Sequence, residues 1–425
     1  MNRRVVITGL GIVAPNGNGL EAYEAALRAG TSGICHVPIL EELKFGCTAA
    51  GVPQETDAIA EAYFDEDDLL AMNSSHRFGS IAAVDAWTDA GFARPDREDD
   101  HVYWEAGAVI GTGVGGLDTA GEKLVPMTDA AKVRRLGSTI VEQIMGSGVS
   151  ARISGLLALG NQVTSNSSAC STGAEAIVDG CQRIQNGLAD RMLCGGSEGA
   201  SQYIWAGFDA MRVLSRKFND EPEKASRPLS ASAAGFVPSS GAGVVHLESL
   251  KSAQARGARI YAEVLGSSTN CGGHRQGGSM TAPNPVSVRR CIREAVEKAG
   301  IEYDEIDAIN GHLTATGADP SEVESWAAAL ERTPENLPLI CSTKSMIGHG
   351  LGAAGAMESV ACILMLRGGF VHPSINCEDV HPEIEPYAAS IPHEVVETPD
   401  LRTIIKAGFG FGDVNVCVVF RKWCD

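Results

Sequence analysis

Large aromatic rings and positive charge are both scarce in this sequence. Phe, Trp and Tyr make up 5% of the 425 residues, whereas Gly alone occupies 49 positions. Many glycines with few rings indicate tight turns and close backbone approaches, often around a buried site. Lys and Arg number 34 against 53 Asp and Glu, which gives a formal net charge of −19. This balance argues against a nucleic-acid partner and against binding to anionic membranes.

Long hydrophobic runs are missing as well. No window holds the roughly eighteen continuous apolar residues of a membrane span, and the run 360–366 is far too short. The first eight residues lead straight into strand-like sequence, so we expect no signal peptide. None of the 12 cysteines forms a Cys-x-x-Cys pair, and many lie in Val- and Ala-rich stretches. Free buried thiols in a reducing cytoplasm are therefore expected.

Short apolar segments alternate with helical patterns along the whole chain. Ala-rich helical patterns occur at 78–90, 173–186 and 286–299, whereas prolines interrupt the small polar residues of 219–240 and predict a surface loop. The alternation predicts an α/β architecture with largely buried sheets. Strands are expected at 4–8, 106–110, 191–194, 243–247, 306–310, 339–342 and 403–408.

A weak internal repetition divides the chain. In each half, a strand ends in a turn of small residues that carries a reactive side chain, Cys170 in one and His349 in the other. A Gly- and Ala-rich helix follows each turn. Each half also closes with an apolar strand after glycines, at 241–247 and at 408–420. We therefore predict two similar units, 1–250 and 251–425.

Two glycine motifs, at 9–14 and 111–116, satisfy the Gly-x-Gly-x-x-Gly/Ala fingerprint of dinucleotide-binding units. An NAD-dependent oxidoreductase is therefore one alternative. However, Pro15 and Gly17 interrupt the helix that should begin after the first motif, and Pro126 follows the second. Tight turns that let strands and loops pack closely are the favoured interpretation.

Cys170 lies between a strand-like segment and a helical pattern, with small residues on both sides. Ser171 and Thr172 suit the first turn of a helix, whose amides and dipole lower the pKa of a thiol. Such a thiol becomes a nucleophile at neutral pH. A lone cysteine of this kind is otherwise a small buried residue.

Two histidines share the environment expected for Cys170. His312 follows a strand candidate amid small polar residues, and His349 lies between glycines in a strand-to-helix turn. Their separation of 37 residues and the lack of local carboxylate or thiol partners match no usual zinc pattern, so no metal is expected. A cysteine with two strand-end histidines indicates thiol-based acyl chemistry, and spacing alone balances this against structural histidines.

Several motifs occur together in order: Ser-Ala-Cys170-Ser-Thr-Gly, Asn-Gly-His312, Lys344-Ser-Met-Ile-Gly-His349 and Gly-Phe-Gly-Phe411-Gly. Over residues 3–420 the sequence resembles β-ketoacyl-(acyl carrier protein) synthases, the elongating type II-like group of the thiolase superfamily. The resemblance implies a duplicated α/β/α/β/α layered fold. It also implies a homodimer, or a heterodimer with a related ketosynthase-like subunit.

The resemblance further implies a decarboxylative Claisen condensation of an enzyme-bound acyl thioester with malonyl-acyl carrier protein. The product is a β-ketoacyl-carrier in fatty-acid or type II polyketide or polyene synthesis. No cofactor is bound, and phosphopantetheine arrives on the acyl carrier protein. The resemblance implies that Cys170 accepts the acyl chain, that His312 and His349 stabilise the enolate, that Lys344 tunes these histidines and that Glu358 supports this network. It implies an oxyanion hole formed by the amides of Cys170 and Phe411, with Phe411 also acting as the gate. Thr314 and Thr316 are implied to contact phosphopantetheine, and Arg216 and Lys217 to dock the carrier.

Some positions depart from the family pattern. Leu313 stands where the family has a small residue after the first histidine, and Asp413 stands where it has a second glycine. Asp319 and Glu322 match a family acidic pair only with a one-residue gap. These changes point to a specialised pathway such as polyketide or polyene assembly. A partner subunit of the chain-length-factor type is the alternative, against which the intact Cys170 and two histidines argue.

Overall fold

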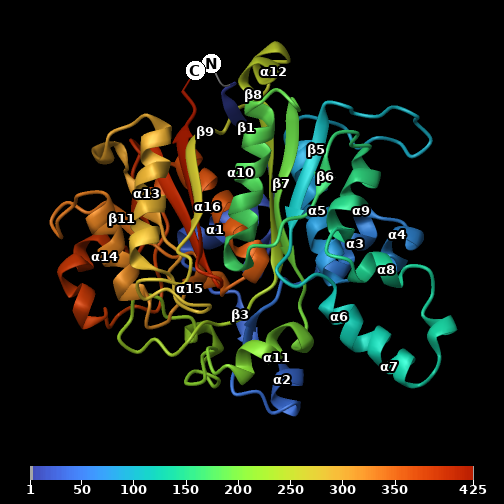
Figure 1. The fold of residues 1–425 in the computed structure, drawn as a ribbon, viewed down its shortest axis with the longest axis horizontal. Helices are drawn as coiled ribbons and strands as arrows, with labels where there is room; N and C mark the ends of the chain where they lie inside the picture. Colours follow the sequence, from blue (N-terminus) through green and yellow to red (C-terminus); the bar gives the residue numbers. More distant parts are fainter. Residues whose placement is uncertain (1–2, 425) are drawn as a thin grey trace.

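The strands of the computed structural model, which describes residues 3–424, form one large mixed sheet and two small ones (Figure 1). The small sheets pair β3 (Ile34–His36) with β4 (Ala49–Gly51) and β12 (Phe370–Val371) with β13 (Val396–Glu397). The large sheet runs β11 (Leu339–Cys341), β10 (Ala308–Asn310), β14 (Thr403–Gly410), β15 (Val414–Lys422), β9 (Ala262–Cys271), β1 (Val5–Ala14), β8 (Gly241–Ser249), β7 (Arg191–Glu198), β5 (Ala106–Gly111) and β6 (Val163–Thr164), with β2 (Gly17–Asn18) beside β1.

The large sheet is built from two five-stranded halves with the same order of pairing. From the centre outward, β1-β8-β7-β5-β6 and β9-β15-β14-β10-β11 each show two antiparallel pairings followed by two parallel ones. The halves join through a short antiparallel contact of β1 with β9, in which Val6 faces Glu263 and Ile7 faces Ala262. Topology therefore repeats along the chain although the two sequences have diverged.

Helices form three layers around these half-sheets. In the middle, α10 (Thr172–Gln185) packs on α16 (Ala354–Gly368), and both contact strands of each half (Figure 1). The outer layers are α5 (Ser74–Asp89) with α9 (Gly148–Leu157) on one side and α13 (Pro285–Ala299) with α14 (Asp319–Ala329) on the other. Shorter helices complete the chain: α1 (Leu20–Ala29), α2 (Pro38–Glu42), α3 (Thr56–Tyr63), α4 (Glu66–Leu70), α6 (Leu117–Thr119), α7 (Val125–Asp129), α8 (Ile140–Ile144), α11 (Gln202–Ala210), α12 (Leu250–Ala255) and α15 (Lys344–Ile347).

The predicted helices at 78–90, 173–186 and 286–299 are confirmed as α5, α10 and α13. Local capping shows why α13 has its bounds. The Asn284 side chain accepts a hydrogen bond from the Val286 amide, Pro285 occupies the first turn, and Gly300 ends the helix at φ +66°.

The predicted strands are confirmed, with two corrections. β9 was not predicted, because its second half, Gly-Ser-Ser-Thr-Asn-Cys, is polar and weakly strand-like. The segment 408–420 is a hairpin of β14 and β15 rather than one strand, because Gly412 and Asp413 turn the chain at φ +89° and +62°. The loop 219–240 is confirmed as irregular chain with one helical turn (Pro222–Lys224), but much of it is buried.

The first glycine motif is part of β1 rather than a turn. A Cβ on Gly9 would lie 2.1 Å from the Ala86 oxygen, and one on Gly11 would lie 1.8 Å from the Ala82 oxygen. The glycines therefore let β1 approach α5 closely, which confirms the expected close packing. The turn predicted at this motif is wrong, because the residues form a strand. The strand continues where a dinucleotide fold needs a helix to begin, so the first motif does not form such a unit. The second motif ends β5 and leads only into the three-residue helix α6 (Leu117–Thr119), which is too short for the helix of that unit.

One helical stretch, Leu351–Gly368, is long and apolar enough to cross a membrane by length and composition, with a mean hydropathy of 1.3 over 18 residues. It includes the run 360–366, so a stretch of sufficient length and hydropathy exists where the sequence analysis expects none. Since 89% of it is buried inside the fold, it serves as the core helix α16.

Candidate active site

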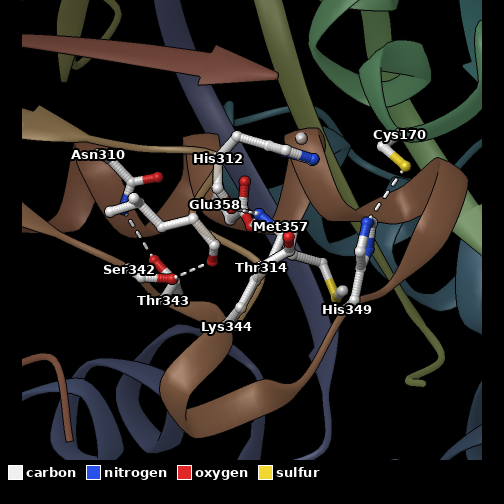
Figure 2. Close-up of polar contacts among 12 residues, drawn as sticks. Cys170, Asn310, His312, Thr314, Ser342, Thr343, Lys344, His349, Met357 and Glu358 are labelled. Atoms are coloured by element: carbon white, nitrogen blue, oxygen red, sulfur yellow. Dashed lines mark hydrogen bonds and ion pairs between the residues drawn. The ribbon is translucent and has the colours of Figure 1, made fainter. Parts of the chain in front are cut away.

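Three segments far apart in the sequence bring Cys170, His312 and His349 into one cavity of 560 Å³. Cys170 lies in a single helical turn (Ala169–Ser171) that leads into α10. His312 follows β10, and His349 follows α15. Figure 2 shows the contact between Cys170 and His349. The three turns therefore converge where the middle helices meet the two half-sheets. The expected strand-to-helix turn is wrong for His349, because the short helix α15 stands between β11 and this turn.

His349 directs an N–H group at the sulfur. Its Nε2 lies 3.1 Å from Cys170 Sγ, while the Leu351 amide donates to its Nδ1 at 3.1 Å. An Nδ1 that accepts a hydrogen bond leaves the proton of the neutral ring on Nε2. The ring centroids of His312 and His349 lie 5.5 Å apart at an interplanar angle of 84°. Two imidazoles thus border the space beside the sulfur.

Both imidazoles are held in the neutral form. The pKa of His312 lies well below its usual value, first because the ring is buried and then because of the charge on Lys344. Burial and the charges of Lys344 and Lys406 likewise lower the pKa of His349 well below its usual value. Neutral imidazoles that carry N–H donors can stabilise a developing oxyanion without a change of protonation.

The Cys170 thiol differs from the sequence expectation. The helix start and dipole were expected to lower its pKa, but burial raises the pKa to about 11. The amides of Phe411 and Cys170 and the charge of Lys344 favour the thiolate, yet they do not outweigh desolvation. The expected lowering of the Cys170 pKa is therefore wrong: the residue is only partly buried, yet desolvation of its sulfur favours the thiol in the free protein.

The backbone around the sulfur supplies two amide donors. Ala169 adopts φ +51°, which turns the chain so that the Cys170 amide faces the cavity side with that of Phe411. A Cβ on Gly410 would lie 3.0 Å from the Cys170 nitrogen, so glycine lets the two segments approach without crowding. The Phe411 ring lines the cavity and lies 6.2 Å from the ring of Phe208.

A buried charge network lies below the histidines. Lys344 Nζ donates to the carbonyl oxygen of His312 at 2.7 Å and also contacts Glu358, as the resemblance implied for these residues. Glu358 pairs with a second lysine that the sequence analysis missed, because Lys406 Nζ lies 2.6 Å from Glu358 Oε2. The available signal was a charged residue inside the apolar strand 403–408.

Two buried carboxylates hold the loop after His312. Glu322 accepts the amides of His312 at 2.6 Å and Leu313 at 2.8 Å, and burial raises the pKa of Glu322 to about 7. Asp319 accepts the amides of Thr314 and Ala315 at 2.9 and 3.0 Å. The acidic pair therefore shapes the loop that presents His312.

The predicted phosphopantetheine contacts lie at the cavity, whereas the predicted docking residues lie outside it. Thr314 and Thr316 line the cavity, with their Oγ1 atoms 3.0 Å apart. Arg216 and Lys217 are exposed and follow the cavity-lining residue Val213 by a few positions. Arg216 also pairs with Asp209 at 3.3 Å.

The same cysteine and histidines form a group that could hold a metal ion, since one ligand atom of each lies within 4.8 Å of the others. A thiolate with two imidazoles is a donor set that zinc accepts. A metal bound here would have to displace the thiol proton, and burial raises the pKa of that thiol to about 11. The absence of a metal stays a prediction.

Comparisons with known proteins agree along the whole chain. The family described as "Beta-ketoacyl synthase, N-terminal domain" matches residues 2–253, and its C-terminal counterpart matches 261–378. The chain is 36% identical to 3-oxoacyl-[acyl-carrier-protein] synthase 1 of Haemophilus influenzae, over 99% of both chains. It is 34% identical to 3-oxoacyl-[acyl-carrier-protein] synthase 2 of Vibrio cholerae, again over 99% of both.

Solved structures give the same result. The ishigamide ketosynthase/chain length factor superposes with a TM-score of 0.88 at 30% identity over the whole of both chains. A type II PKS ketosynthase solved with its acyl-carrier protein, AntDE:AntF, gives 0.86 at 27% identity, also over the whole of both. These matches confirm the thiolase-like α/β fold that the sequence predicts.

Proposed function

Since the chain belongs to the β-ketoacyl synthase family, we propose that it catalyses decarboxylative Claisen condensation of an enzyme-bound acyl group with malonyl-acyl carrier protein. The observation that carries the proposal is the 3.1 Å contact of Cys170 Sγ with His349 Nε2, beside His312 in one cavity. A soft sulfur nucleophile and two neutral N–H donors are what thioester exchange and enolate formation require.

The first step loads the acyl chain. The Cys170 sulfur attacks the carbonyl carbon of an acyl-carrier thioester, the bond to the carrier sulfur breaks, and the thiol proton leaves with the carrier thiol. The amides of Cys170 and Phe411 serve as the oxyanion hole for the tetrahedral intermediate, because both donors already lie beside the Cys170 sulfur and favour negative charge on it.

The second step forms the carbon–carbon bond. The malonyl-carrier loses CO₂, and the electron pair of the broken bond passes to the thioester oxygen as an enolate. His312 and His349 hold that oxygen through N–H donors. The enolate carbon attacks the acyl group on Cys170, whose C–S bond breaks and releases the thiolate, which takes up a proton. Lys344 orients His312 through its carbonyl oxygen, and Glu358 holds Lys344.

The acyl carrier protein is the proposed partner, and it brings the phosphopantetheine arm to a site without a bound cofactor. Thr314 and Thr316 are suited to contact the arm because both residues line the cavity and carry hydroxyl groups that pair with each other. Arg216 and Lys217 are exposed basic residues that follow the cavity-lining Val213 by a few positions, on a chain of net charge −19. Carriers of this family are acidic, so local positive charge favours docking.

We propose that the chain works in the cytoplasm as a dimer, and that its halves 1–250 and 251–425 are the two repeated units. Their matching strand order supports the second point. An edge strand, β6, and a stretch of exposed apolar side chains support the dimer. The side chains of that stretch are Leu117, Val125, Val133, Val141 and Met145.

The alternative is a chain-length-factor-like partner of a ketosynthase heterodimer. It is favoured by the likeness to the ishigamide ketosynthase/chain length factor. The intact Cys170 with both histidines opposes it, because a non-catalytic subunit has no need of a nucleophile. The departures at Leu313 and Asp413 favour polyketide or polyene synthesis over general fatty-acid elongation.

The test is intact-protein mass spectrometry after incubation with a panel of acyl-carrier thioesters, for the wild type and Cys170→Ala. An adduct on the wild type alone, followed by β-ketoacyl product on addition of malonyl-carrier, is the expected result. An adduct that persists in Cys170→Ala would overturn the assignment of the nucleophile. Loading without condensation would overturn the proposed reaction, and no loading by any chain would favour the partner-subunit alternative.

A further inference from the structure

Lys406 is a cation in the middle of the core. It lies on β14 between Ile405 and Ala407, and its side chain is 0% exposed. In the parallel pairing of β14 with β10 it stands opposite Asn310, two residues before His312. The ammonium group contacts the Ala407 carbonyl oxygen and lies 2.6 Å from Glu358 Oε2.

Glu358 is shared by two lysines. Lys344 contacts its Oε1 and Lys406 its Oε2, and all three side chains are at most 2% exposed. With both lysines protonated, two ammonium groups and one carboxylate give this cluster a net charge of +1, and burial lowers the pKa of Lys344 while the charge of Glu358 raises it. The other buried carboxyl near Lys344 is Glu322, whose pKa burial raises to about 7, so it offsets that charge only in part at neutral pH.

Stability gives little reason for such a cluster. Moving a charge out of water costs several kcal/mol, and apolar residues of similar volume often stabilise a core as well or better. Lys344 already neutralises Glu358, so Lys406 adds an uncompensated cation. This excess positive charge lies close to both histidines, and that location suggests a role in the reaction.

We propose that Lys406 is a positioning residue for the condensation: by sharing Glu358 with Lys344, it keeps a net positive charge below His312 and His349, where the enolate oxygen forms. This inference rests on the proposed function. The positive potential opposes protonation of the imidazoles and stabilises the negative charge that decarboxylation creates. Acyl loading forms its oxyanion at the amides of Cys170 and Phe411, and it needs this charge less.

The charge of Lys406 acts on several groups, and variants must be judged against all of them. Those on neighbouring elements are Glu358 and Cys362 of α16, Lys344 of α15, Cys341 of β11, Cys417 of β15, and the two histidines.

The experiment compares two neutral variants, Lys406→Met and Lys406→Gln, with the charge-retaining Lys406→Arg. Ile404→Val, on the same strand and core face, is the matched packing control. Acyl loading is followed by intact mass, and CO₂ release from malonyl-carrier is followed by steady-state kinetics. We expect the neutral variants to lose about tenfold or more in kcat for decarboxylation, with KM and acyl loading within about twofold of wild type. Lys406→Arg and Ile404→Val are expected to retain both steps.

Loss of loading and decarboxylation to the same extent in both neutral variants would assign Lys406 a structural role and overturn the inference. Unchanged decarboxylation in the neutral variants would overturn it too. Either result presupposes an active wild type, so a wild type that loads acyl chains but releases no CO₂ would refute the proposed function instead.

Discussion

The pH dependence of Cys170 alkylation tests the electrostatics of the site most directly. Burial raises the thiol pKa to about 11. At pH 7.5 the thiolate fraction is then about 1 in 3,000, against about one tenth for an unperturbed cysteine of pKa about 8.5. Because only the thiolate reacts, Cys170 should be alkylated about 300 times more slowly than free cysteine at this pH.

The assay is iodoacetamide labelling of the resting enzyme between pH 7 and pH 10, with the Cys170 peptide quantified by mass spectrometry. The rate should rise about tenfold per pH unit across this range, since each unit below the pKa multiplies the thiolate fraction by about ten. The exposed Cys271 and Cys424 are reference thiols in the same sample. An alkylation rate of Cys170 that levels off below pH 8 would refute this reasoning. It would mean that the helix N-terminus and the backbone amides lower the thiol pKa more than burial raises it.

This prediction bears on the order of events in acyl loading. A resting thiol has to lose its proton as the thioester arrives, when the amides of Phe411 and Cys170 can favour the sulfur anion and then the carbonyl oxyanion. His349 is not arranged to take that proton in the resting state, because its Nε2 already carries one. A protonated resting thiol also resists oxidation between turnovers.

Three other changes have definite expected outcomes. Arg216→Glu with Lys217→Glu should raise KM for the carrier substrate about tenfold, because an acidic carrier is repelled, and should leave the reaction with small acyl thioesters unaffected. Steady-state kinetics with both substrates tests this, and equal losses of activity with the two substrates would contradict carrier docking at these residues. Glu322→Gln should lower unfolding free energy by about 1–3 kcal/mol in thermal melts, because it replaces the carboxylate that accepts the His312 and Leu313 amides, and should slow decarboxylation more than loading. Chelator treatment should leave both steps unchanged and elemental analysis should find no stoichiometric metal, whereas one bound equivalent would assign the cysteine and histidines to a metal site.

The local sequence predicts this site well where the reactive side chain lies in the turn itself. Cys170, His312 and His349 stand in turns of small residues, but those turns follow β6, β10 and α15 of two different half-sheets, and the tertiary fold brings them into one cavity. The sign of the Cys170 pKa shift was not predictable in this way. It depends on how completely other segments cover the sulfur, and only the tertiary structure fixes that.

Lys406 and β9 show the same limit in the core. A lysine within apolar sequence gives no indication of its partner, because Glu358 reaches it from a helix in a different part of the chain. β9 has too few apolar residues to be recognised alone, and it becomes a strand because β15 and β1 pair with it on either side.

The two departures from the family pattern, Leu313 and Asp413, are explained by competing energies. Both adopt positive φ, 28° and 62°, which costs a non-glycine residue about 1–2 kcal/mol. Leu313 is fully buried in the core beside α14, and burying a leucine is worth about 1.5–3 kcal/mol. The buried Asp413 carboxylate accepts the amides of His274 and Asn284 at 3.0 and 2.7 Å. Hydrogen bonds to a charged group contribute about 1.5–3 kcal/mol each, more than the strain, so a glycine at either position would relax the backbone and still destabilise the loops around the cavity.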